Sequence, residues 1–226
     1  MAGIKQIGTQ RTTTKGVQVE NQDTWLLKTL DDHLTGTQRP NRTGVFYPSV
    51  LGSKCDAHLF LAYNGLLPVE VLPAVTRRIF DTGGSLEQRM EKYFERMGIL
   101  LEREKSLKFD NPPISGRCDF ILLHEEDGQI VIELKSANNR TFTNLRLTPK
   151  PEHTIQLQIY LNILGFDRGV VLYENKDNQQ LKAFKVDRDN DQWNSIINRC
   201  FKIMGMNTIP KTCKGSTWCP CRSVKR

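Results

Sequence analysis

The chain contains 226 residues, of which 38% are hydrophobic and 25% are charged, and its net charge at pH 7 is +7. This length suits one α/β domain with decorations, and no apolar run approaches the length of a bilayer span, so the composition is that of a soluble protein without a membrane partner. No acidic residue follows Asp191, whereas seven basic residues do: Arg199, Lys202, Lys211, Lys214, Arg222, Lys225 and Arg226. Such a basic region suits a polyanion, although terminal lysines and arginines also serve solubility.

The first 44 residues are expected to form an arm and a helix outside the main domain. Residues 1–22 are polar and rich in threonine, which is typical of an extended or partly flexible segment. Over residues 23–34, Trp25, Leu26, Leu30 and Leu34 recur at helical spacing. Residues 45–226, which include a basic tail rich in cysteine, are then expected to form a single domain.

The next part of the chain changes from helical to extended patterns. Helices are expected over residues 49–64, 70–80 and 85–98, and strands over residues 105–111, 115–124 and 129–135. Ser85 is a candidate N-cap for the third of these helices. Its apolar stripe consists of Leu86, Met90, Tyr93, Phe94 and Met97.

The last two strands are expected to form a hairpin with charged residues at one end. Asp127-Gly128 is a strong turn signal between two apolar runs. Folding about this turn places Asp119 within a residue or two of Glu133 and Lys135, which share one face of their strand. Two carboxylates can hold a divalent cation, and a nearby amine can position or activate an attacking water. Together these are the chemistry of phosphodiester cleavage. An ordinary surface hairpin with a Glu/Lys pair is the alternative.

A polar segment and a helix follow the hairpin. Residues 136–152 include Arg140, Arg146 and Lys150, which either contact a nucleic acid or belong to a long surface loop. In the helix expected over residues 153–164, Gln156 and Tyr160 are four apart and share a face, either toward a site or toward solvent. Strands over residues 169–173 and 181–186 and a helix over residues 189–204 come next. The whole pattern predicts an α/β fold with a mixed central β-sheet flanked by helices.

Three motifs in chain order resemble those of the PD-(D/E)XK nuclease superfamily: Asp119, Glu133-Leu-Lys135 and Gln156-x-x-x-Tyr160. The last of them is similar to the third motif of the RecB-like branch of that superfamily. The resemblance covers residues 45–222 and implies a restriction-endonuclease-like core. It also implies a role for each motif residue. Mg²⁺ or Mn²⁺ would bind to Asp119, Glu133 and the backbone of Leu134, water would be positioned by Lys135, and substrate would be positioned by Gln156 and Tyr160.

Glu87 is a further candidate for the metal site. RecB-like nucleases often carry Gly-x-x-x-His in this region, with the histidine near the metal, and this chain has Glu87 four residues after Gly83. The chain departs from the family here, but an acidic residue can still contact a metal or its water. The alternative is an acidic residue near a helix N-terminus, where the helix dipole favours negative charge.

Four of the six cysteines flank the expected core. Without a signal peptide, a reducing and cytoplasmic compartment is expected, where clustered thiols bind metal more often than they form disulfides. Four thiolates complete a zinc site or anchor an iron–sulfur cluster. Cys55 precedes the core, whereas Cys213, Cys219 and Cys221 follow it. Cys200 is an alternative ligand, although its place on an expected helix favours a buried core residue.

This arrangement is similar to that of the RecB-like nucleases of the AddB type and of CRISPR adaptation. In those families one cysteine before the core and three after it bind a [4Fe-4S] cluster that staples the two ends together. The resemblance implies the same cluster here, with Zn²⁺ as the alternative. The chain departs from the family in its spacing, because the close pair is Cys219-Pro-Cys221 where a Cys-x-x-Cys is usual.

The sequence therefore predicts a metal-dependent DNase. The first expectation is an exonuclease on single-stranded or processed DNA ends in recombination, replication or genome processing, in a bacterial or phage-infected cytoplasm, with a replication or recombination protein as partner. A structure-specific or nicking endonuclease is one alternative. A non-catalytic DNA-binding or assembly module of a phage complex is another.

Overall fold

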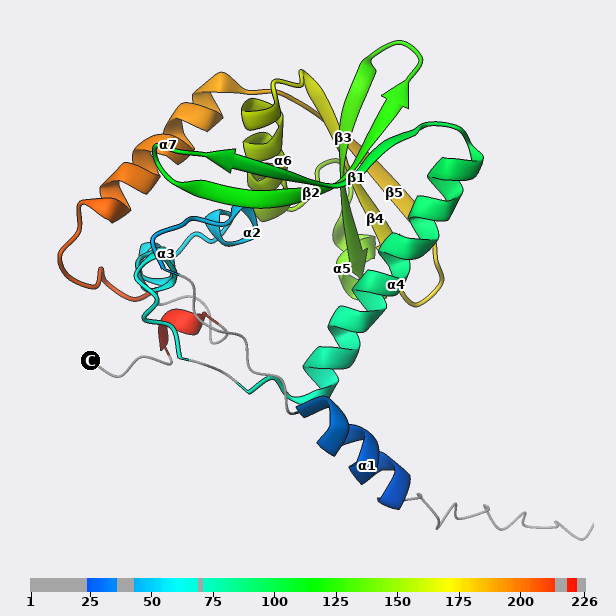
Figure 1. Ribbon diagram of the computed structural model, residues 1–226, viewed down its shortest axis with the longest axis horizontal. Helices are drawn as coiled ribbons and strands as arrows, with labels where there is room; N and C mark the ends of the chain where they lie inside the picture. Colours follow the sequence, from blue (N-terminus) through cyan, green and yellow to red (C-terminus); the bar gives the residue numbers. More distant parts are fainter. Residues whose placement is uncertain (1–23, 36–42, 69–70, 214–218, 223–226) are drawn as a thin grey trace, which may run out of the picture.

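The computed structural model describes residues 24–35, 43–68, 71–213 and 219–222, so the arm expected over residues 1–22 lies outside the described residues (Figure 1). In chain order the elements are α1 (Thr24–Thr35), α2 (Pro48–Leu51), α3 (Asp56–Tyr63), α4 (Ala74–Arg96), β1 (Leu100–Phe109), β2 (Ile114–His124), β3 (Gly128–Ala137), α5 (Asn139–Asn144), α6 (Pro151–Leu164), β4 (Arg168–Asn175), β5 (Leu181–Asp187), α7 (Asn190–Met204) and the short 3₁₀ helix η1 (Pro220–Arg222). No helix in these ranges is both long enough and apolar enough to cross a bilayer.

The five strands form one mixed sheet in the order β1-β2-β3-β4-β5. Neighbouring strands are antiparallel except β3 and β4, which are parallel and are connected through α5 and α6. A parallel pair requires such a crossover, whereas β2 and β3 are joined by a short turn that ends at Gly128, whose φ of 70° suits glycine. The predicted α/β class with a mixed sheet and flanking helices is confirmed.

Helices cover both faces of the sheet, and the residues of β3 divide between them. Ile130, Ile132 and Leu134 point to the face on which Leu86, Met90 and Phe94 of α4 pack. Val131 points the other way, into a cluster with Leu157 and Leu161 of α6. Figure 1 shows α4 and α6 on opposite sides of the sheet. Since side chains alternate along a strand, Glu133 and Lys135 share one face, as the sequence predicts, and this is the face that α6 covers.

Helix α4 corrects two predictions. It is one helix of 23 residues that passes through Gly83 and Gly84, where the sequence pattern predicts a break between two helices. Ser85 is not an N-cap, because it lies inside the helix and its hydroxyl donates to the carbonyl of Asp81 at 3.0 Å. Each interior glycine costs about 1 kcal/mol relative to alanine, and the packing of the apolar stripe on the sheet outweighs that cost.

Three boundaries also differ from prediction. The helix expected over residues 49–64 is two helices, α2 and α3, separated around Gly52, where a Cβ atom would lie 2.6 Å from the carbonyl oxygen of Glu152. Strand β1 begins at Leu100, five residues earlier than expected, and the polar segment 136–152 contains α5. The close approach of α2 to α6 is a tertiary contact that a local pattern does not contain.

Candidate functional site

The candidate site lies where β2 separates from β3. The paired residues of these strands run from His124↔Gly128 to Phe120↔Ile132, so the next step of the same register brings Asp119 opposite Glu133. At this step the two strands are no longer joined by a backbone-to-backbone hydrogen bond, and a side chain accepts the hydrogen bond instead. The amide of Leu134 donates to Oδ2 of Asp119 at 2.6 Å. The hairpin thus brings Asp119, Glu133 and Lys135 together, as the turn and the alternation predict.

The carboxylate of Glu133 is fully buried and poorly compensated. Within the described residues its Oε1 contacts only the ammonium of Lys135, in an ion pair, and its Oε2 accepts no hydrogen bond. Burial, reinforced by the charge of Asp119, raises the pKa of Glu133 to about 8. Burial also raises the pKa of Asp119 to about 6, against the lowering effects of Lys135 and the Leu134 amide. Burial lowers the pKa of Lys135, but the negative charge of Glu133 outweighs it, and the net shift is upward.

These carboxylates fit a hard divalent cation. Burial of an unpaired carboxylate is costly, and a bound cation offsets that cost while using oxygen atoms as its preferred ligands. Two acidic groups whose charged forms are both disfavoured by burial are a common feature of catalytic sites. Asp119 and Glu133 are therefore suited to hold Mg²⁺ or Mn²⁺ together.

A pocket of about 480 Å³ opens beside Asp119. Its walls come from α2, β2, α4 and α6, and they consist of Tyr47, Pro48, Ser49, Glu87, Ser115, Gly116, Arg117, Asp119, Gln156 and Tyr160. The amide nitrogen of Gln156 donates to the hydroxyl of Tyr160 at 2.7 Å. Both of these side chains are buried, so neither is the solvent-facing residue that the sequence left as an alternative. Glu87 also reaches this pocket, which places the three motif regions around one cavity.

Sequence reasoning missed Arg117 on the pocket wall and its ion-pair partner on β1. Arg117 forms an ion pair with Glu104 at 2.9 Å, and Glu104 has a φ of 52°, which is uncommon for a residue other than glycine. In the β1–β2 register, Glu104 is the position across from Asp119, between the pairs Arg103↔Phe120 and Lys105↔Cys118. The backbone is therefore strained beside a candidate metal ligand, which is typical of functional sites. A charged residue in the left-handed region leaves no signal in the sequence.

A second polar network lies under the start of α6. The hydroxyl of Tyr173 accepts a hydrogen bond from the amide of Lys150 at 3.0 Å and lies 2.7 Å from Nδ1 of His153. Burial, together with the positive charges of Lys135 and Lys150, lowers the pKa of His153 to about 3. The imidazole is therefore neutral at physiological pH and shares a hydrogen bond with the hydroxyl of Tyr173. The β3–β4 register pairs Tyr173 with Lys135, so this network supports the strand segment that carries the lysine.

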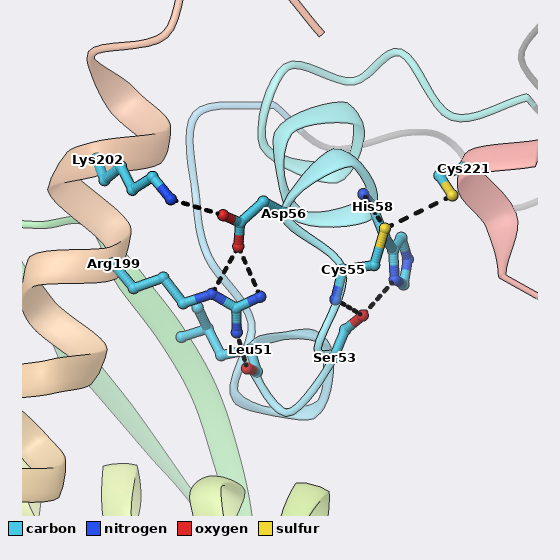
Figure 2. Close-up of polar contacts among 8 residues, drawn as sticks. All are labelled: Leu51, Ser53, Cys55, Asp56, His58, Arg199, Lys202 and Cys221. Atoms are coloured by element: carbon cyan, nitrogen blue, oxygen red, sulfur yellow. Dashed lines mark hydrogen bonds and ion pairs between the residues drawn. The ribbon is translucent and has the colours of Figure 1, made fainter. Parts of the chain in front are cut away.

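The second candidate site is a cluster of four thiols at the base of α3. The sulfur atoms of Cys55, Cys213, Cys219 and Cys221 all lie within 4.8 Å of one another, and these are the four residues that the sequence selects. Sγ of Cys55 lies 3.5 Å from Sγ of Cys221 (Figure 2), and Sγ of Cys213 lies 3.7 Å from the latter. Cys200 is buried in α7 within a separate apolar cluster and does not take part, in agreement with its interpretation as a core residue.

Cys55 also serves as the N-cap of α3. Its sulfur accepts a hydrogen bond from the backbone amide of His58 at 3.4 Å, and the hydroxyl of Ser53 lies 3.2 Å from Nδ1 of the same histidine (Figure 2). Burial raises the pKa of Cys55, but hydrogen bonds from His58 and Cys213 outweigh this effect and lower the pKa to about 7. The environment of Cys55 therefore favours the thiolate, which is the form that binds metals.

Two residues of the predicted basic region have a structural role instead. Figure 2 shows Arg199 and Lys202 of α7 directed at Asp56 of α3. Nε of Arg199 lies 2.9 Å from Oδ1 of Asp56, and Nζ of Lys202 lies 2.9 Å from Oδ2. These ion pairs connect α7 to the helix that carries Cys55. Lys214, Lys225 and Arg226 lie outside the described residues.

Comparison with known proteins identifies the fold. No protein-family model and no curated sequence matches the chain. The crystal structure of SSO0001 is similar with a TM-score of 0.53 and 19% identity, over 88% of this chain and 93% of that one. An alkaline exonuclease, LHK-Exo from Laribacter hongkongensis, is similar with a TM-score of 0.51 and 16% identity, over 78% of this chain and 90% of that one. LHK-Exo in complex with dAMP also has a TM-score of 0.51, with 17% identity, over 71% of this chain and 86% of that one. The chain thus has an exonuclease-like fold.

Proposed function

We propose that this protein is a divalent-metal-dependent deoxyribonuclease of the PD-(D/E)XK type. The observation that carries the proposal is a pair of neighbouring carboxylates, the buried one of Glu133 and the partly buried one of Asp119, with Lys135 paired to Glu133 and an open pocket beside Asp119. In a purely structural ion pair, the second buried oxygen of Glu133 would also be expected to accept a hydrogen bond, and Oε2 accepts none from the described residues.

The proposal assigns a role to each residue of the site. Asp119, Glu133 and the backbone carbonyl of Leu134 hold Mg²⁺ or Mn²⁺, with Glu87 contacting the metal or its water from α4. The metal, when bound, lowers the pKa of water and offsets the charge of the phosphate. Lys135 orients the attacking water and stabilises negative charge as it develops. Gln156 and Tyr160 hold the substrate and fix the position of the lysine, since their mutual hydrogen bond restricts both side chains.

We further propose DNA as the substrate and an exonuclease as the activity. The support comes from the similar structures, of which one is an alkaline exonuclease and another is the same enzyme in complex with dAMP. Arg117 on the pocket wall is a cation suited to a phosphate. Arg140 and Arg146 of the exposed segment after β3 provide further positive charge.

The six free thiols suit a reducing, cytoplasmic compartment.

The test is an end-labelled DNA cleavage assay with Mg²⁺ or Mn²⁺. Lys135→Ala is expected to lose cleavage by at least about a hundredfold, as removal of a group that acts in the transition state does. Lys185→Ala is the matched control, because it removes the same charge from the surface of β5 and is expected to retain activity. Circular dichroism and urea unfolding of both variants confirm that they are folded.

Other outcomes separate the alternatives. Undiminished cleavage by pure Lys135→Ala would remove this lysine from the mechanism. Cleavage of circular single-stranded DNA, which has no ends, would identify an endonuclease. A wild-type protein that cuts no form of DNA and binds no Mg²⁺ would be a non-catalytic DNA-binding or assembly module.

A further inference from the structure

The geometry of the four-cysteine cluster points to a single tetrahedral metal ion, zinc by its chemistry, where the family resemblance implies a [4Fe-4S] cluster. This inference concerns a site separate from the carboxylate pocket. It does not depend on DNA cleavage, and its test uses no DNA.

The distances between the sulfur atoms carry the argument. A zinc–thiolate bond is about 2.3 Å, so four sulfurs at the corners of a regular tetrahedron around one zinc lie about 3.8 Å apart. The sulfur of Cys221 lies 3.5 Å from that of Cys55 and 3.7 Å from that of Cys213, and all four sulfurs lie within 4.8 Å of one another. A four-iron cluster gives each thiolate an iron of its own, so its ligands must stand further apart than the ligands of one ion. The observed cluster is too compact for that arrangement.

The surroundings of the cluster are those of a closed structural site. Cys55 and Cys221 are buried, and they pack with Ala57 and Leu61 of α3 in a small apolar cluster that Cys213 and Cys219 complete. The sulfurs are far beyond the disulfide bond length of about 2.05 Å, so a disulfide does not account for their proximity. The amide of His58 donates to Sγ of Cys55, which is the type of support that holds metal ligands in place. A closed set of four thiolates is the usual structural zinc site.

The site connects parts of the chain that are far apart in sequence. Cys55 and Cys221 are 166 residues apart, and the metal would join the start of α3 to η1. Asp56 independently ties α3 to α7 through Arg199 and Lys202 (Figure 2). The ion would therefore fasten the segment after α7 to α3, which η1 already contacts.

The first measurement is the metal content of the full chain. The protein is produced in medium supplemented with both iron and zinc, purified without oxygen, and analysed by elemental mass spectrometry and visible absorbance. One zinc per chain, with no iron and no visible colour, is expected. About four irons per chain with a broad visible absorbance would overturn the inference. So would a metal-free protein in which all four thiols react with a thiol reagent under native conditions.

Two cysteine variants then locate the ion. Cys213→Ser is expected to lose zinc and to lower the melting temperature, whereas Cys200→Ser, which removes a buried thiol outside the cluster, is expected to retain one zinc per chain. Equal zinc content in both variants would overturn the inference. If Cys213→Ser does not fold, cobalt exchange into the wild type replaces it. The visible spectrum of tetrahedral Co²⁺ with four thiolates supports the site, and a six-coordinate cobalt spectrum or no cobalt uptake overturns it.

Discussion

The ion pair between Arg89 of α4 and Glu174 of β4 is expected to be one of the most sensitive points of the fold. Nη2 of Arg89 donates to both oxygens of Glu174, at 2.6 and 2.7 Å. The side chain of Glu174 is only 6% exposed, whereas that of Arg89 is 37% exposed. Removal of the arginine would leave a buried carboxylate without its partner.

The expected cost follows from this burial. Loss of one partner from a fully buried ion pair costs about 3–5 kcal/mol. Because the guanidinium is partly exposed, water can reach the site after its removal, so we expect Arg89→Met to cost about 2–3 kcal/mol. This corresponds to a decrease of about 30- to 150-fold in the folding equilibrium constant and a decrease of about 5–10 °C in melting temperature for a chain of this size.

Urea unfolding of Arg89→Met and of a matched variant, Arg103→Met, measures this effect. Arg103 also pairs with a glutamate of α4, Glu91, but more of that glutamate is exposed, with 23% of its side chain accessible. Exposed pairs contribute less than about 1 kcal/mol, so the control is expected to unfold close to the wild type. Equal losses in the two variants would refute the reasoning. The double variant Arg89→Met with Glu174→Gln is expected to recover part of the stability, since no buried charge then remains.

Two further predictions concern packing and pH. Gly116→Ala is expected to lower the free energy of unfolding by about 1–3 kcal/mol, because the new Cβ atom would lie 2.7 Å from the ring of Pro48. In the matched variant Gly84→Ala the new Cβ atom meets no atom within 4 Å, so this variant is expected to raise the free energy of unfolding by about 1 kcal/mol. An unchanged urea midpoint for Gly116→Ala would contradict the close contact. The pKa of His153 is about 3 in the folded protein, below its ordinary value of 6.5, so the unfolded chain takes up the proton first as the pH falls. The free energy of unfolding is therefore expected to decrease between about pH 6.5 and pH 3, by up to about 1.4 kcal/mol per pH unit. His153→Phe should lack this part of the decline, and parallel pH curves for the two proteins would refute it.

The hairpin and its charged end were predictable because their signals are local. The Asp127-Gly128 turn and the alternation along each strand determine which residues face each other, and the register brings Asp119 opposite Glu133. The same holds for Gln156 and Tyr160, since a spacing of four within a helix places two side chains together without reference to the rest of the fold.

The remaining features depend on contacts between distant segments. Gly83 and Gly84 favour a break, yet α4 continues through them because its apolar stripe packs on the sheet. The positive charges of Arg199 and Lys202 suggest a free basic surface, but only the tertiary structure shows that Asp56 engages both. The positive φ of Glu104, across from Asp119, likewise has no counterpart in the composition of β1.

The separation between Cys55 and the other three thiols has a consequence for the newly made protein. The whole sheet, from Leu100 to Asp187, is synthesised after Cys55 and before Cys213. Because synthesis runs from the N-terminus, Cys55 leaves the ribosome without its three partner thiols while the sheet is still being made. Metal capture would be the final step of assembly, and the lone thiol of Cys55 would be the group most open to oxidation until that step is complete.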